Sequence, residues 1–172
     1  MVVSSPAVTS VHATFVDPTR MRVEARTAEG LTVILDSSAE GGAGAAPAPM
    51  ETLLAALAGC TSMDVASILR KKRQRPSRYE IVLDGTRAGA HPDVFTRIVV
   101  EHRVEGAVEV EALRRSIELS ATRYCPVNAM LSAAVVIEHR YLLRGEGGRQ
   151  QSGLVVTTGP GHRLPGAIAP GA

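Results

Sequence analysis

Residues 49–69 read PMETLLAALAGCTSMDVASIL and form the most apolar stretch of the chain. Apolar and small side chains occur nearly all round a helical projection of this segment, which predicts a helix buried on most sides. We expect the helix to run from about Met50 to Arg73. Pro47 and Pro49 restrict the backbone just before it, and the basic cluster RKKRQR suits the C-terminal end of a helix dipole. The rest of the chain must then pack around this helix.

The same stretch is long enough to raise the question of a membrane span. Asp64 is the only charged residue between Thr52 and Leu69, but small and polar residues interrupt the segment at positions 59, 61, 62 and 67. A buried core helix is therefore the better interpretation. The N-terminus, MVVSSPAVTSVHAT, has no basic region followed by an apolar one. We expect a cytoplasmic protein with no membrane partner, in which thiols are kept reduced.

Strand patterns flank the helix on both sides. Apolar residues alternate with charged ones around positions 20–25, so residues 8–35 predict a β-meander, followed by a loop over 36–48. The same period of two predicts strands over 79–84, 97–104 and 135–143, and helices are expected over 109–124 and from Pro126 to about Ala134. We predict an α/β (α+β) fold, with an antiparallel meander and a second sheet segment packed around the long helix.

The domain organisation predicted from these patterns is simple. Residues 1–144 should form one domain, because 172 residues are enough to bury one substantial core. Residues 145–172 are rich in Gly and Pro, and we expect a disordered tail there. The run LVVTT at 154–158 has strand character but stands alone.

Composition argues against several classes of function. The net charge is only +2 and aromatic residues make up 3% of the chain, which disfavours a nucleic-acid partner. No His or Cys pair has the spacing of a metal site, and no glycine-rich phosphate motif follows a strand, so we expect no metal and no cofactor. His102 and His139 fall on apolar strand faces, where a hydrogen-bonded core or interface histidine is the usual explanation.

Two cysteines carry the remaining chemistry. Cys60 lies in the middle of the long helix, where desolvation alone would raise its pKa. Cys125 directly precedes Pro126, so it should be the N-cap of a short helix, where the positive end of the dipole favours a thiolate. Spacing alone leaves two interpretations open. The first is that both thiols serve only to pack the core, and the second is that they are a nucleophile and its resolving partner.

The pattern AAPAPMETLLAALAGCTSMDV, followed about 65 residues later by YCPVNAML and a closing strand, resembles the OsmC/Ohr family of thiol-dependent hydroperoxide reductases. The match covers about residues 8–143. The resemblance implies that Cys60 attacks an organic hydroperoxide and that the resulting sulfenic acid condenses with Cys125. A small dithiol or a dithiol protein then reduces the disulfide. The resemblance also implies an intertwined homodimer with its active sites at the interface.

The family pattern includes an Arg beside the first Cys and a Glu directly after the helix-opening proline. Here Met50 follows that proline and the carboxylate comes one residue later, at Glu51. One helical step turns a side chain by about 100°, so the sequence departs from the pattern at this point. Arg20 is the best match for the family Arg, with Arg22 and Arg26 as rivals. The Pro-Met-Glu form resembles a third, less characterised OsmC-like branch.

The expected catalytic residues are therefore Cys60, Cys125, Glu51 and Arg20. The expected function of the protein is that of a hydroperoxide reductase. The alternative is a small-molecule binding or redox-sensing protein on the same scaffold. A purely structural partner protein is disfavoured by the small residues around Cys60.

Overall fold

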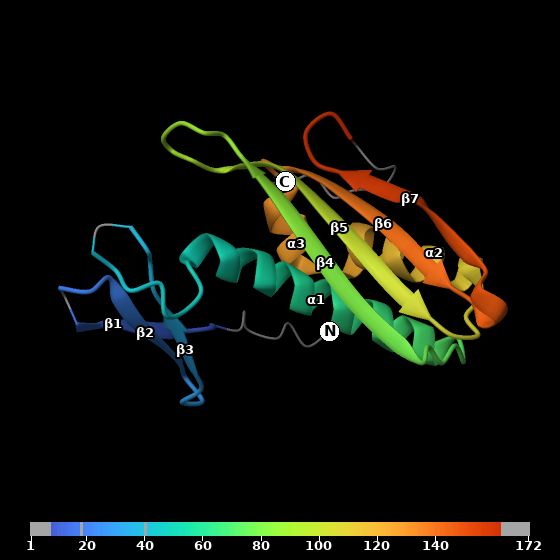
Figure 1. The fold of residues 1–172 in the computed structure, drawn as a ribbon, viewed down its shortest axis with the longest axis horizontal. Coiled ribbons are helices and arrows are strands. Elements are labelled where there is room, and N and C mark those ends of the chain that lie inside the picture. Colours follow the sequence, from blue (N-terminus) through green and yellow to red (C-terminus); the bar gives the residue numbers. More distant parts are fainter. Residues whose placement is uncertain (1–7, 18, 40, 163–172) are drawn as a thin grey trace, which may run out of the picture. The chain divides into compact units, whose positions relative to one another are not determined.

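A computed structural model describes residues 8–17, 19–39 and 41–162 (Figure 1). The chain forms two compact units, which divide at residue 53, inside the long helix. Each unit contains one β-sheet. The mixed class of helices and strands expected from the sequence is confirmed.

The first unit is the predicted meander. It is a three-stranded antiparallel sheet in the order β1-β2-β3, made of Val11–Asp17, Arg22–Thr27 and Thr32–Leu35. Gly30 closes the second turn at a φ of +82°, a conformation that favours glycine, and its N–H donates to the Thr27 carbonyl. The loop that follows is held by Asp36, whose carboxylate accepts hydrogen bonds from the backbone N–H groups of Ser37 and Ala45.

The long helix α1 spans Pro49–Lys71, within two residues of the predicted bounds. Its burial differs from the expectation. The buried residues form one stripe at every fourth position, Leu57, Thr61, Val65 and Leu69, whereas the sequence predicted burial on most sides. An apolar pattern does not say what covers each face of a helix, and within the described residues the chain covers one face of α1.

The second unit contains a four-stranded sheet in the order β4-β5-β6-β7. Its strands are Arg78–Arg87, Phe95–Glu105, Val136–Arg144 and Gln150–Thr158. β5 and β6 are parallel and the other two pairs are antiparallel. The parallel pair requires a crossover, which consists of α2 (Val110–Leu119), a π-helical turn η1 (Ser120–Tyr124) and α3 (Pro126–Leu131).

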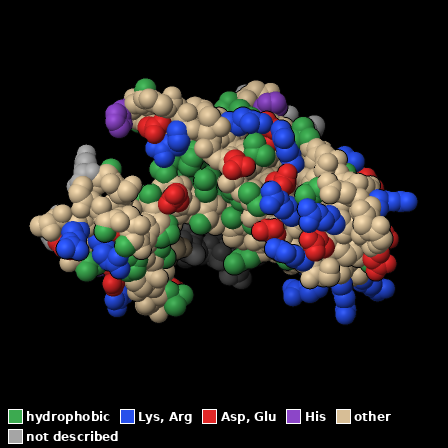
Figure 2. Space-filling view, in the orientation of Figure 1, with side chains coloured by type: hydrophobic (Ala, Val, Ile, Leu, Met, Phe, Trp, Pro, Cys, Tyr) green, Lys and Arg blue, Asp and Glu red, His purple; other side chains and the backbone are tan. Residues whose placement is uncertain are grey.

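The two faces of this sheet differ in character. On one face, side chains of the sheet pack with Val65 and Leu69 of α1 and with Leu113 and Ile117 of α2 to form the hydrophobic core. Figure 2 shows the other face, where acidic and basic side chains intermingle over β4 and β5. Arg97 and Arg140 both pair with Glu138 there. A one-sided sheet of this kind explains the period of two in the sequence.

The predicted disordered tail is wrong for residues 150–158. These residues form β7, which pairs antiparallel with β6 from Ile137↔Thr158 to Arg144↔Gln150. The Gly-rich turn before β7 returns the chain along β6, whose backbone groups would otherwise stand unpaired at the edge of the sheet. Residues 163–172 lie outside the described residues.

Candidate active site

Helix α1 presents Cys60 and Asp64 on the same side, one turn apart. The helix begins at Pro49, and the Glu51 carboxylate accepts a 2.9 Å hydrogen bond from the backbone N–H of Ala48, directly before the helix. This reach back from the third helical residue is half of a capping box. The four-residue spacing then places the Cys60 and Asp64 side chains next to each other.

The crossover between β5 and β6 presents Cys125. The π-helical turn η1 ends with a hydrogen bond from the Cys125 N–H to the Ser120 carbonyl (2.9 Å). Cys125 is the N-cap of α3, with Pro126 in the first helical position, as the sequence predicted. Its sulfur accepts hydrogen bonds from the Asn128 N–H (3.3 Å) and the Thr61 hydroxyl (3.5 Å). The side chain is therefore buried but held on polar contacts.

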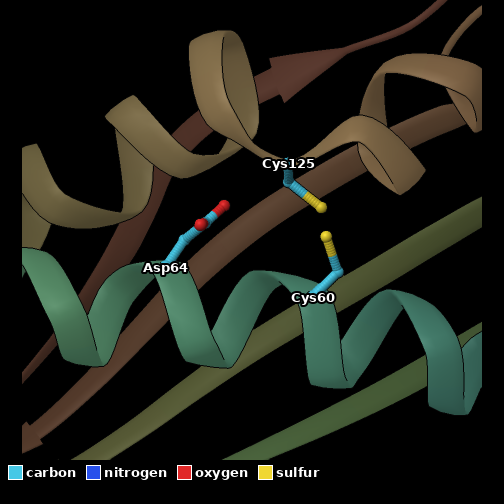
Figure 3. A group of neighbouring side chains, drawn as sticks. All are labelled: Cys60, Asp64 and Cys125. Carbon is cyan, nitrogen blue, oxygen red and sulfur yellow. The ribbon is translucent and has the colours of Figure 1, made fainter. Parts of the chain in front are cut away.

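These two elements bring three side chains together (Figure 3). The sulfur atoms of Cys60 and Cys125 and a carboxylate oxygen of Asp64 all lie within 4.8 Å of one another. Both cysteines are free thiols. The Ser120 hydroxyl also donates a hydrogen bond to Asp64 Oδ2 at 3.1 Å. The redox pair predicted from the sequence is thus brought into one cluster.

The surroundings of Cys60 favour its protonated form. Burial raises the pKa of the Cys60 thiol to about 11, the Cys125 thiol adds to the rise, and Asp64 contributes through its charge. The backbone N–H of Val127 acts in the opposite direction. A thiol with this pKa holds its proton at neutral pH, so a nucleophilic role for Cys60 requires a nearby cation.

A chain of buried polar side chains leads from Tyr79 to the helix that carries Cys125. The Tyr79 hydroxyl is hydrogen-bonded to His102 Nδ1 (2.8 Å), His102 Nε2 to His139 Nδ1 (3.4 Å), and His139 Nε2 to Asn128 Oδ1 (2.9 Å). The Asn128 amide N–H donates to the Ala121 carbonyl, so Oδ1 is the acceptor and both neutral imidazoles carry the proton on Nε2. The expectation of hydrogen-bonded core histidines is confirmed.

Burial keeps these histidines neutral. Desolvation lowers the pKa of His139 to about 4, and desolvation together with His139 lowers the pKa of His102 well below its ordinary value. Both imidazoles are fully buried. The network thus orients Asn128, and through the backbone of Asn128 it holds the sulfur of Cys125.

The other two expected site residues belong to the first unit and have contacts there. Glu51 caps the helix, as described above, and Arg20 pairs with Asp17 (Nε to Oδ2, 3.6 Å). The rival Arg26 pairs with Glu24. The roles of Glu51 and Arg20 beside Cys60 stay predictions.

Asp64 is the residue that sequence reasoning missed. In the sequence Asp64 stands out only as the single charged residue between Thr52 and Leu69. The spacing of four residues after Cys60 was the available signal, because residues i and i+4 of a helix are neighbours. The proximity of Asp64 to Cys125 has no such signal in the sequence, because it depends on tertiary packing.

Comparison with known proteins identifies relatives along most of the chain. A family model described as OsmC-like protein matches residues 41–140. Protein YhfA of Escherichia coli strain K12 is 38% identical over 129 residues, which cover 70% of this chain and 96% of YhfA.

Solved structures share the fold. A hypothetical protein from Aquifex aeolicus has a TM-score of 0.71 at 28% identity, over 82% of this chain and 99% of that one. An organic hydroperoxide resistance protein OsmC from Legionella pneumophila has a TM-score of 0.59, over 78% of this chain and 96% of that one. Its identity of 16% supports a likeness in fold alone.

Proposed function

Since the chain belongs to the OsmC-like family, we propose that it reduces organic hydroperoxides with Cys60 and Cys125 as a redox pair. The observation that carries the proposal is the approach of two free thiols to within 4.8 Å. The resemblance of the sequence to the OsmC/Ohr family implies this substrate class, and a protein of the same fold is named as an organic hydroperoxide resistance protein.

The proposed chemistry has three steps that balance. The Cys60 thiolate attacks the distal oxygen of the hydroperoxide, the O–O bond breaks, and the alkoxide takes a proton and leaves as the alcohol. The Cys60 sulfenic acid then condenses with the Cys125 thiol, forming a disulfide and releasing water. A small dithiol or a dithiol protein in the cytoplasm reduces the disulfide and is itself oxidised.

The first step requires a cation that lowers the pKa of Cys60 from about 11. We retain Arg20 for this role, with Arg22 and Arg26 as rivals, and Glu51 as the carboxylate that positions the arginine. The capping contact of Glu51 uses Oε2, which leaves Oε1 for a guanidinium. A carboxylate can accept hydrogen bonds at both oxygens.

Replacing Glu51 with glutamine is expected to slow alkylation of Cys60 at pH 7 several-fold, with little change in stability. Glutamine keeps an oxygen that can accept the Ala48 N–H bond but carries no charge for the arginine, so the pKa of Cys60 should rise further. The measurement is the rate of iodoacetamide labelling in Cys125→Ser protein, where Cys60 is the only thiol.

Glu51→Ala is the matched control. It removes the cap as well as the charge and should cost about 1 kcal/mol of unfolding free energy while slowing alkylation to the same extent. Equal alkylation rates in wild-type protein and both variants would assign Glu51 to the helix cap alone.

Mass spectrometry after one equivalent of an alkyl hydroperoxide tests the proposed function. We expect a peptide pair linked between Cys60 and Cys125, together with one equivalent of alcohol. Untreated protein and Cys125→Ser protein should show no such link. Consumption of peroxide without linkage of these two residues would contradict the redox-pair mechanism.

The exposed face of α1 supports the proposal of a homodimer. The helix is apolar nearly all round, yet its buried residues form only the stripe Leu57, Thr61, Val65 and Leu69, and Met63 is 74% exposed. By length and composition such a helix could cross a membrane. We propose that a second copy of the chain covers this face, and light scattering, which reports twice 18.1 kDa for a dimer, checks it.

The raised pKa of Cys60 favours one alternative. A thiol that is protonated at neutral pH reacts slowly with peroxide, which suits a redox-sensing or small-molecule binding protein on the same scaffold. Repeated turnover in the presence of a dithiol separates the two functions, because a sensor is oxidised once and a reductase consumes peroxide continuously.

A further inference from the structure

The cluster in Figure 3 has the composition of a metal site. It combines two cysteine sulfurs with one carboxylate oxygen, all within 4.8 Å of one another. No sequence motif describes it, because Cys60 and Asp64 are joined by one helical turn and Cys125 arrives from the crossover after β5. The sequence predicted no metal because no His or Cys pair has the spacing of a metal site. That argument does not apply to ligands that are brought together by tertiary packing.

The carboxylate is hard to explain by thiol chemistry alone. Its negative charge lies beside the Cys60 sulfur and repels the thiolate that peroxide reduction needs. Within residues 8–17, 19–39 and 41–162, the ion pairs are formed by other acids, and Asp64 takes part in none of them. A carboxylate beside two thiols, without a cationic partner, is an anionic set that a divalent cation would complete.

The distances suit zinc. Zinc binds sulfur at about 2.3 Å and carboxylate oxygen at about 2.0–2.2 Å, so two sulfur ligands of one ion lie about 3.8 Å apart. The ligand atoms of Cys60, Asp64 and Cys125 lie within 4.8 Å of one another, at most about 1 Å more than this separation. Three protein ligands leave the fourth tetrahedral position for water.

Neighbouring groups already hold two of the three ligands. Ser120 donates to Asp64 Oδ2 at 3.1 Å, which leaves Oδ1 for the ion. The Asn128 N–H and the Thr61 hydroxyl donate to the Cys125 sulfur and hold it in place. Metal sites depend on outer contacts of this kind to orient their ligands.

We propose that the reduced protein binds one zinc ion through Cys60, Asp64 and Cys125. Binding displaces both thiol protons, so one Zn²⁺ enters and two H⁺ leave. A disulfide between the two cysteines removes two of the three ligands, so the oxidised protein releases the ion. Bound zinc in turn occupies both thiols and protects them from oxidants and alkylating reagents.

Titration of untagged, reduced protein under anaerobic conditions tests this assignment. Zn²⁺ is added against a chromophoric chelator, and Co²⁺ is used as a spectroscopic probe. We expect one ion per chain and an intense sulfur-to-cobalt charge-transfer band. Both thiols should become protected from a disulfide reagent. Cys60→Ser and Cys125→Ser should each lose the binding, and Asp64→Asn, which loses a direct ligand, should weaken it by at least the roughly tenfold that even an outer contact contributes.

Asp84→Asn is the matched control, because Asp84 is an exposed acid on β4 and its loss should leave the affinity unchanged. Circular dichroism verifies that each variant is folded, and the wild-type cobalt spectrum needs no variant. Cobalt binding without the sulfur band, or equal affinity in reduced and disulfide-linked protein, overturns the site. Equal affinity in wild-type protein and Asp64→Asn overturns the role of Asp64. Peroxide turnover is measured separately, so its loss alone leaves the zinc site standing.

Discussion

Replacing Cys60 with serine is expected to abolish peroxide consumption, a loss of about a thousandfold or more, because the hydroxyl is a far weaker nucleophile than a thiolate. Replacing Cys125 with serine should instead permit a single turnover. The sulfenic acid at Cys60 then has no resolving thiol within the cluster and persists. Stopped-flow peroxide consumption, with dimedone labelling and mass spectrometry, measures both results.

The order of oxidation is the informative part of this comparison. Cys125 is the N-cap of α3 and accepts hydrogen bonds at its sulfur, whereas burial raises the pKa of Cys60. A trapped sulfenic acid at Cys125 in the Cys60→Ser variant would reverse the assigned roles of the two residues. Thr61→Val serves as a control, since it removes one donor to the Cys125 sulfur and should alter resolution rather than the first attack.

Acidification from pH 7 to pH 4 is expected to lower the free energy of unfolding by about 3 kcal/mol through His139 alone. Its pKa is about 4 in the folded chain and 6.5 when exposed, so the unfolded state binds a proton between these values and the folded state does not. Stability is therefore complete above about pH 6.5 and falls as the pH drops toward 4. His102, whose pKa is also lowered, should steepen the loss.

Urea denaturation across this pH range measures the effect. His139→Gln should flatten the profile while lowering stability at pH 7, because it removes the titration but disturbs the hydrogen bond to Asn128. His12 lies on an exposed strand, and His12→Gln should leave the profile unchanged. A wild-type stability that is constant from pH 6.5 to pH 4.5 would contradict the burial of a neutral histidine pair.

Most of the fold could be predicted from local patterns. The meander, the bounds of α1 and the cap at Cys125 all follow from periodicity and from the positions of prolines. The strand β7 could not, because its strand-like run LVVTT stands alone in a Gly-rich segment and its place is decided by the free edge of β6. The one-sided burial of α1 was also beyond reach, since the pattern does not distinguish contacts within a chain from contacts between chains.

The candidate site could be predicted only in part from local sequence. The cysteines could be identified because the chain has only two and each lies on or beside a predicted helix. Asp64 could not be identified, because one acidic residue per apolar helix is common and its meaning depends on what packs beside it. Glu51 shows the reverse case. Its position relative to Pro49 suggested a role beside Cys60, and its observed contact is with the backbone of Ala48.

The two neighbouring thiols are 65 positions apart in the chain, and this separation has a thermodynamic consequence. A bond between them would close a ring containing β4, β5 and α2, which restricts the unfolded chain and stabilises the fold by about 4 kcal/mol. Linkage requires that folding stabilise the bond by the same amount. For a two-electron couple this lowers the reduction potential by about 90 mV relative to the unfolded dithiol. A dithiol whose reduction potential lies between those of the unfolded and the folded protein would reduce only the unfolded protein. The reductant of the folded protein must therefore have a lower potential than that of the folded disulfide.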